Sequence, residues 1–240
     1  MSNIEKFLEM VQESDNIVFF GGAGVSTESG IPDFRSVDGL YNQKYDYPPE
    51  TILSHTFYMR HTEEFYRFNR DKMLCLDAKP NVTHQKLAEL EAAGKVKAVI
   101  TQNIDGLHQM AGSRRVLELH GSVHRNYCQK CGKGFDAEYI LKSGTEIPLC
   151  DACGGKIKPD VVLYEEGLNQ QTLEDAVFYI SHADVLIIGG TSLAVYPAAG
   201  LIDYYRGNKL VLINKSTTPM DGRADLLIQA GLGEVFSQIW

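Results

Sequence analysis

The sequence predicts an α/β fold built on a doubly wound parallel sheet. Short runs rich in β-branched residues alternate with longer stretches of helical periodicity, which is the pattern of parallel strands joined by crossover helices. A glycine-rich turn, Gly21-Gly22-Ala23-Gly24, directly follows the first apolar run, as in sheets that bind a ligand at their carboxyl edge. Of the 240 residues, 44% are hydrophobic, which is enough to fill a sizeable core.

The N-terminal half predicts one strand and several helices. Residues 2–13 are amphipathic, with apolar side chains on one helical face. Residues 17–20 are apolar, β-branched and aromatic, as in a buried strand. Two helices are expected within residues 50–75, and another over 81–93, which Gly94 ends.

The C-terminal half continues the alternation. Further strands are expected at residues 96–100, 116–119, 185–188 and 210–213. Helices are expected over residues 170–181, from Tyr196-Pro197 onward and at the end of the chain. The sheet is interrupted at residues 34–79 and 121–165, where the sequence predicts insertions.

The glycine-rich turn has two interpretations. It is either ordinary punctuation or a place where backbone N–H groups approach a pyrophosphate. In an ordinary dinucleotide-binding unit, a second strand ends in an acidic residue that holds the ribose roughly 20 residues later. Residues 38–60 instead contain four tyrosines and Pro48-Pro49 without an apolar strand, so a conventional hydride-transfer enzyme is disfavoured.

Most candidates for chemistry follow the ends of predicted strands. Each alone is as compatible with a turn as with a ligand. Carboxyl ends of parallel strands share one edge of a sheet, however, and open sheets bind ligands there. The sequence therefore predicts one site composed of Gly21–Ser26, Thr101–Asp105, His120, Gly189–Ser192 and Asn214.

Four of the five cysteines form two C-x2-C pairs, Cys128 with Cys131 and Cys150 with Cys153. This spacing favours one structural zinc ion in a ribbon. Two disulfides or a redox-active pair are the alternatives, and a reducing compartment disfavours both. Four thiolates leave no open coordination position, so the zinc is expected to stabilise the fold and not to catalyse.

Charge and hydropathy limit the partners. The chain has 31 acidic and 23 basic residues, which disfavours direct binding of nucleic acid. No segment approaches the roughly 20 apolar residues of a membrane span, and the N-terminal residues lack the pattern of a signal peptide. We therefore expect a cytoplasmic protein without membrane association, whose acidic surface suits a cationic, lysine-bearing partner.

Several segments together resemble the sirtuins of bacterial type, which are NAD-dependent protein-lysine deacylases. The motifs occur in the family's order, with the cysteine quartet between them, and the resemblance covers about residues 4–239. The segments are Gly22-Ala23-Gly24-Val25-Ser26, Gly30-Ile31-Pro32-Asp33-Phe34-Arg35, Thr101-Gln102-Asn103-Ile104-Asp105, Leu119-His120-Gly121 and Gly190-Thr191-Ser192.

The resemblance implies three structural parts. A Rossmann-like NAD-binding domain would comprise residues 1–33, 80–120 and 166–240. Residues 34–79 would form the cofactor loop and a helical insertion. Residues 121–165 would form a zinc-ribbon module and the start of the strand that binds substrate.

The resemblance also implies an activity, NAD-dependent deacetylation of lysine in acetylated proteins or peptides. The acetyl oxygen would attach to the ribose of NAD as nicotinamide leaves, and His120 would act as general base on the ribose diol. The products would be deacetylated lysine and O-acetyl-ADP-ribose. The alternatives are a protein ADP-ribosyltransferase, a longer-chain deacylase and a non-catalytic NAD-sensing or zinc-ribbon interaction module. Intact Asn103, Asp105 and His120 disfavour the last.

Individual roles follow from the same resemblance. Asn103 and His120 are the implied catalytic residues, whereas His108 and His124 are expected to be non-catalytic. Asp105 would hold the nicotinamide carboxamide. The residues implied to contact NAD are Gly22, Ala23, Gly24, Thr27, Asp33, Phe34, Arg35, Gln102, Asn103, Ile104, Asp105, His120, Gly190, Thr191, Ser192, Asn214, Lys215 and Leu232.

A peptide substrate is expected to bind by strand addition at Val162, Leu163, Tyr164 and Glu165. Many relatives have Phe-Gly-Glu where this chain has Tyr164-Glu165-Glu166. Glu165 therefore replaces a glycine, and we expect a cationic flank on the peptide.

The helical insertion bears on the acyl group. Relatives that remove acidic acyl groups carry Tyr-x-x-Arg there, whereas Tyr66 is followed three places later by Asn69. Arg70 is one residue further and is expected to point elsewhere on the helix. We therefore expect acetyl or longer apolar acyl groups in preference to succinyl.

Overall fold

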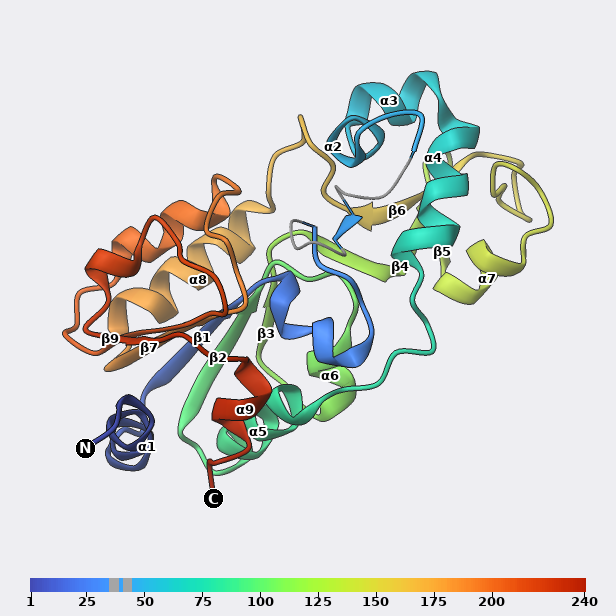
Figure 1. Cartoon of the computed structure of the whole chain (residues 1–240). Coiled ribbons are helices and arrows are strands. Elements are labelled where there is room, and N and C mark those ends of the chain that lie inside the picture. Colours follow the sequence, from blue (N-terminus) through green and yellow to red (C-terminus); the bar gives the residue numbers. More distant parts are fainter. Residues whose placement is uncertain (35–38, 41–44) are drawn as a thin grey trace.

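The computed structural model describes residues 1–34, 39–40 and 45–240, and its main feature is a sheet of six parallel strands (Figure 1). The order is β3-β2-β1-β7-β8-β9, so it reverses direction between β1 and β7. This reversal is where doubly wound sheets form a ligand-binding crevice. The strands are β1 (Ile17–Gly21), β2 (Val96–Thr101), β3 (Val116–Glu118), β7 (Val185–Gly189), β8 (Leu210–Ile213) and β9 (Leu226–Ile228).

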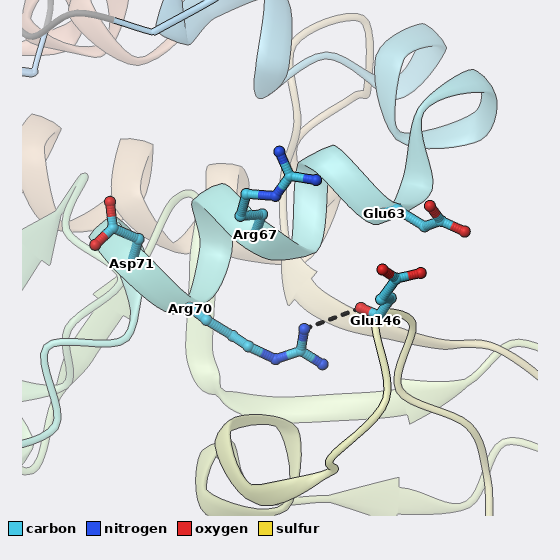
Figure 2. Close-up of a pocket in the computed structure, with 5 residues that line it drawn as sticks. All are labelled: Glu63, Arg67, Arg70, Asp71 and Glu146. Carbon is cyan, nitrogen blue, oxygen red and sulfur yellow. Dashed lines mark hydrogen bonds between the residues drawn. The ribbon is translucent and has the colours of Figure 1, made fainter.

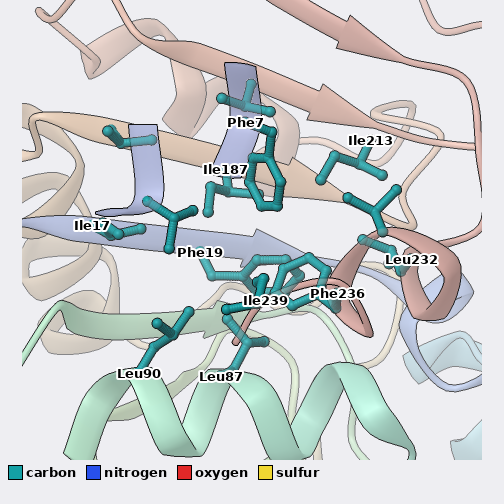
Figure 3. Close-up of a cluster of buried hydrophobic side chains, with 14 of the residues drawn as sticks. Phe7, Ile17, Phe19, Leu87, Leu90, Ile187, Ile213, Leu232, Phe236 and Ile239 are labelled. Atoms are coloured by element: carbon teal, nitrogen blue, oxygen red, sulfur yellow. The ribbon is translucent and has the colours of Figure 1, made fainter. Parts of the chain in front are cut away.

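Both faces of the sheet are covered. Phe19 and Ile187 face a core formed with α1 (Asn3–Glu13), α5 (Val82–Ala92) and α9 (Leu232–Phe236), which Figure 3 shows. Phe20 and Ile188 face the other side, where α8 (Gln170–His182) and the 3₁₀ helix η5 (Ala198–Tyr204) pack. Every residue of β1 and β7 is buried, which explains why these strands are continuous apolar runs in the sequence.

A second body packs beside the sheet's carboxyl edge and combines the two insertions (Figure 1). Tyr66 is fully buried in its core, and its hydroxyl donates to the carbonyl of Ile157. The helical insertion therefore shares one hydrophobic core with the cysteine-bearing module. The elements are α2 (Pro49–Ile52), α3 (His55–Arg60), α4 (Thr62–Phe68), the π-helical turn η4 (Asn69–Met73), β4 (Gly121–Cys128), β5 (Gly134–Phe135), α7 (Ala137–Lys142) and β6 (Ile157–Val161).

The predicted doubly wound fold is confirmed, with local differences. Residues 50–75 form three α-helices and a π-helical turn where two helices were expected. The helix restarts at α3 because Ser54 caps it, its Oγ accepting from the N–H of Phe57. The helix expected from Tyr196-Pro197 is the 3₁₀ helix η5, which begins at Ala198.

Three strands and several short helices lie outside the predicted elements. The strands are β5, β9 and the longer β4, whereas β6 overlaps the strand expected at residues 159–164; α6 (Leu107–Ala111), α7, η1 (Ala23–Val25), η2 (Thr27–Ser29) and η6 (Asp221–Arg223) are the helices. Within the described ranges, no helix is long and apolar enough to cross a membrane.

Candidate functional site

Two glycine turns meet backbone to backbone at the point where the strand order reverses. The N–H of Gly24, in the turn after β1, donates to the carbonyl oxygen of Gly190, after β7, at 2.8 Å. A Cβ on Gly24 would lie 2.8 Å from the Cα of Gly190, and one on Gly22 would lie 2.8 Å from the Cβ of Thr191. Glycine is therefore required for this close packing, which leaves the turns open toward the crevice.

Ser26 joins the glycine turn to the loop after β2. Its Oγ donates to Oδ2 of Asp105 at 2.6 Å and accepts from Nδ2 of Asn103 at 3.1 Å. The other oxygen of Asp105 accepts from the N–H of Leu107 at 2.9 Å. The structure thus brings Asn103 and Asp105 together through Ser26, which lies in the predicted site segment Gly21–Ser26 but is absent from the residues implied to contact NAD. Its position within the glycine-rich motif was the available signal.

Gln102 and Asn214 connect the remaining loops of the edge. Nε2 of Gln102 donates to Oγ1 of Thr191 at 3.0 Å. Nδ2 of Asn214, after β8, donates to the carbonyl oxygen of Thr191 at 3.3 Å. The loops after β1, β2, β7 and β8 are therefore linked at one edge of the sheet, as the sequence predicts.

His120 lies between β3 and β4, with its ring held by the loop after β2. Nδ1 contacts the carbonyl oxygen of Gln102 at 3.0 Å. Because a carbonyl only accepts, Nδ1 carries the proton and Nε2 keeps its lone pair. Burial lowers the pKa of His120, and the hydrogen bond to Gln102 partly opposes this shift. The imidazole is therefore held neutral at neutral pH, and Nε2 is suited to accept a proton.

The two histidines expected to be non-catalytic have structural contacts. His124 lies in β4, and its Nε2 donates to the backbone carbonyl of Asp105 at 2.8 Å. His108 is 1% exposed and packs against His84, with 4.7 Å between their ring centroids. His124 thus supports the segment that carries Asp105, and His108 is part of the buried packing.

The other predicted contact residues lie around the same edge. Oγ1 of Thr27 donates to the carbonyl oxygen of Gly24 at 3.1 Å. Phe34 packs against the core of the second body. Leu232 is buried at the start of α9, where a Cβ on Gly189 would lie 2.6 Å from its Cδ2.

Three more of the predicted contact residues are Asp33, Lys215 and Arg35. The carbonyl oxygen of Asp33 accepts from the N–H of Leu40 at 2.9 Å. Lys215 lies close to the turn before α9, with its Cε 3.1 Å from a Cβ placed on Gly231. Arg35 lies outside the described residues.

The four paired cysteines converge on one point. Their sulfurs lie within 4.8 Å of one another, with Cys128 to Cys153 at 3.5 Å and Cys131 to Cys150 at 3.6 Å. Disulfide sulfurs would be about 2.05 Å apart, whereas tetrahedral Zn–S bonds of about 2.3 Å place sulfurs about 3.8 Å apart. The quartet therefore fits a structural zinc ion and not two disulfides.

The predicted peptide segment lies beside His120. The N–H of Val162 donates to the carbonyl oxygen of His120 at 3.0 Å. Tyr164 forms a parallel bridge with Ser54, through which the segment contacts the helical insertion. Glu165 follows with φ 77°, in the left-handed region that favours glycine. This backbone conformation gives a physical reason for glycine in the relatives' Phe-Gly-Glu pattern.

Arg70 points away from the peptide segment, as predicted. It lines a surface pocket of about 350 Å³ with Glu63, Arg67, Asp71 and Glu146 (Figure 2). Its guanidinium donates to the carbonyl oxygens of Ile140 at 3.1 Å, Thr145 at 2.7 Å and Glu146 at 2.9 Å. These hydrogen bonds hold the guanidinium of Arg70 against the end of α7 and the loop that follows it.

Known proteins resemble the whole chain. A family model described as the Sir2 family matches residues 22–197. The NAD-dependent protein deacetylase of Clostridium acetobutylicum is 61% identical over 241 residues, which cover 100% of this chain and 98% of the relative. A solved structure of Sir2 with p53 peptide and NAD+ has a TM-score of 0.88 at 43% identity, covering 100% of this chain and 97% of that chain. A Sir2 variant with deacetylated p53 peptide and 3′-O-acetyl ADP-ribose has a TM-score of 0.91 at 42% identity, covering 98% and 96%.

Proposed function

The chain belongs to the Sir2 family, the sirtuins, and we propose that it deacetylates acetyl-lysine side chains of proteins with NAD as co-substrate. The observation that carries the proposal is the orientation of the neutral His120 ring. Its Nδ1 is bound to the carbonyl oxygen of Gln102, which leaves Nε2 as the nitrogen that can accept a proton. NAD supplies the ADP-ribose that accepts the acetyl group as nicotinamide leaves, and one water molecule is consumed when the free lysine and O-acetyl-ADP-ribose are released.

The residues of the chain divide the work in the proposed reaction. The glycine turns after β1 and β7 carry no side chains where they meet, so the phosphates would approach the backbone closely there. Asn103 and Asp105, coupled through Ser26, form the polar wall for the nicotinamide carboxamide and its ribose. His120 takes a proton at Nε2 from a ribose hydroxyl, while Gln102 keeps the ring in place through Nδ1.

The substrate side is proposed to be the segment Val162–Glu165, which lies next to His120. An extended peptide added to this segment would carry its acyl-lysine toward the ring. Within the part of the second body that the structure describes, Arg70 is bound to backbone carbonyls, so no cation from this position pairs with an acidic acyl group. Acetyl and longer apolar acyl groups are the proposed substrates.

The test incubates the protein with an acetyl-lysine peptide, with and without NAD, and follows the products by mass spectrometry. We expect deacetylated peptide, nicotinamide and O-acetyl-ADP-ribose only when NAD is present. His120→Ala should lower kcat by about 10²–10⁴. His182→Ala is the matched control, because His182 is exposed at the end of α8. Nicotinamide release with the acetyl group intact would instead indicate an ADP-ribosyltransferase.

A further inference from the structure

The first turn of α3 is capped by the peptide segment. The N–H of Phe57 bonds to Ser54, within the insertion itself. The N–H of His55 donates to the carbonyl oxygen of Tyr164 at 3.0 Å, and the N–H of Thr56 donates to Oε2 of Glu165 at 2.9 Å. These amides have no partner inside the helix, so the segment satisfies two of the three.

The carboxylate of Glu165 accepts two hydrogen bonds from Thr56, one from the backbone N–H and one from the side chain. The same Oε2 also accepts from Oγ1 of Thr56 at 2.7 Å. A carboxylate at a helix N-terminus is favoured by the partial positive charge there. The hydrogen bonds from Thr56 lower the pKa of Glu165, and the charges of His55 and Arg60 act in the same direction. Glu165 therefore stays ionised while it caps α3.

The carboxylate of Glu166 also links the peptide segment to the start of α3. One oxygen of Glu166 lies 2.9 Å from Nδ1 of His55, and the other accepts from the N–H of Leu163 at 3.0 Å and from Nζ of Lys158 at 3.2 Å. Tyr164 donates its own N–H to the carbonyl oxygen of Leu53 at 2.9 Å. The segment is thus tied to the α2–α3 corner from both sides.

We propose that Glu165 is a positioning residue, whose carboxylate clamps the end of the peptide-binding segment to Thr56 at the start of α3. The proposal rests on the proposed deacetylase function and on the segment Val162–Glu165 as its peptide site. It replaces the expectation that Glu165 selects a cationic flank, because both hydrogen bonds of Oε2 are directed to Thr56 and not outward. A glycine at this position adopts the same backbone but cannot form the clamp.

The kinetic test compares Glu165→Gln, Thr56→Val and the double variant on two acetyl-lysine peptides, one flanked by lysine and one by glutamate. Each single change should raise the KM for both peptides equally, by roughly 3- to 10-fold, with kcat and the KM for NAD unchanged. The double variant should be no worse than the poorer single variant, because both changes weaken the same contact: Thr56→Val removes a hydroxyl donor, and Glu165→Gln removes the charge of the acceptor. Glu63→Gln, at an exposed carboxylate on α4, is the control.

Two outcomes would overturn the clamp. An unchanged peptide KM in Glu165→Gln would show that Glu165 does not position the peptide-binding segment. A KM that rises for the lysine-flanked peptide alone would show that Glu165 selects peptides by the charge of their flanking residues.

A second measurement separates the clamp from the proposed function. Amide hydrogen exchange at His55 and Thr56 should be faster in Glu165→Gln than in the wild type, whether or not the protein deacetylates peptides. Equal exchange rates would contradict the clamp. Failure of the wild type to turn over either peptide with NAD would contradict the deacetylase proposal alone.

Discussion

The Oγ of Ser26 lies 2.6 Å from Oδ2 of Asp105, although 79 positions separate the two residues in the chain. Ser26 is 1% exposed, so this contact is shielded from water, where a hydrogen bond to a charged group is strong. The serine fixes the carboxylate proposed to hold nicotinamide against the turn proposed to hold the phosphates. One hydroxyl thereby sets the distance between the two halves of the cofactor site.

Removing this hydroxyl should weaken the use of NAD. Ser26→Ala leaves Oδ2 of Asp105 and the amide of Asn103 without their partner, so we expect kcat/KM for NAD to fall by about 10- to 100-fold. Steady-state kinetics with the peptide at saturation measures the effect. Ser237→Ala is the control, because Ser237 is exposed and its hydroxyl donates to the carbonyl oxygen of the nearby Glu234. Equal kinetics in both variants would argue against the coupling.

The contact between glycine turns predicts a stability effect. In Gly24→Ala the new methyl would lie 2.8 Å from the Cα of Gly190, and a backbone cannot move aside cheaply. We expect the free energy of unfolding to fall by about 1–3 kcal/mol, with a higher KM for NAD. Gly222→Ala is the matched control, because a Cβ there meets nothing within 4 Å. Denaturant unfolding of both variants gives the comparison, and equal stabilities would contradict the close packing.

Zinc removal should unfold the second body. Cys128 and Cys150 are buried in the core shared with the helical insertion, so loss of the ion exposes the packing around Tyr66 as well. We expect one zinc per chain by elemental analysis, and a chelator should lower the melting temperature and abolish peptide turnover. Cys128→Ser should lose the metal.

Cys75→Ser provides the zinc control, because Cys75 lies outside the quartet. A protein that keeps its melting temperature after chelation, with zinc removed, would contradict a structural role.

The sequence predicts the main sheet well and the second body poorly. β1 and β7 are buried on both faces, so their composition alone identifies them. β5 in the second body has two residues, and β9 at the edge of the main sheet has three, which is too short for a periodic pattern.

Part of the candidate site was likewise predictable from the sequence, and part was not. The motif around His120 was recognisable from the family resemblance, and its position at the sheet edge followed from strand order. The orientation of Glu165 was not predictable, because its partner Thr56 lies 109 positions away. Its replacement of a glycine therefore suggested charge selection, whereas the contacts with Thr56 support positioning.

The buried pair His84 and His108 predicts acid sensitivity. Burial lowers the pKa of His84 to about 4, against an opposing effect of Asp105. Burial, with a smaller effect of His84, lowers the pKa of His108 to about 3. In the unfolded chain both pKa values return to about 6.5. Below that pH the unfolded state binds protons that the folded state excludes, so stability is complete above about pH 6.5 and falls as the pH drops toward 4.

The loss should reach about 2 kcal/mol for each histidine at about pH 5. Denaturant unfolding across about pH 5 to 8 measures the slope of stability against pH. His84→Gln and His108→Gln should each flatten this slope, whatever their effect on absolute stability, since glutamine does not titrate. His182→Gln, at an exposed position, should keep the wild-type slope. Unchanged slopes in both buried variants would mean that the pair titrates alike in the folded and unfolded states, which contradicts the effect of burial on both pKa values.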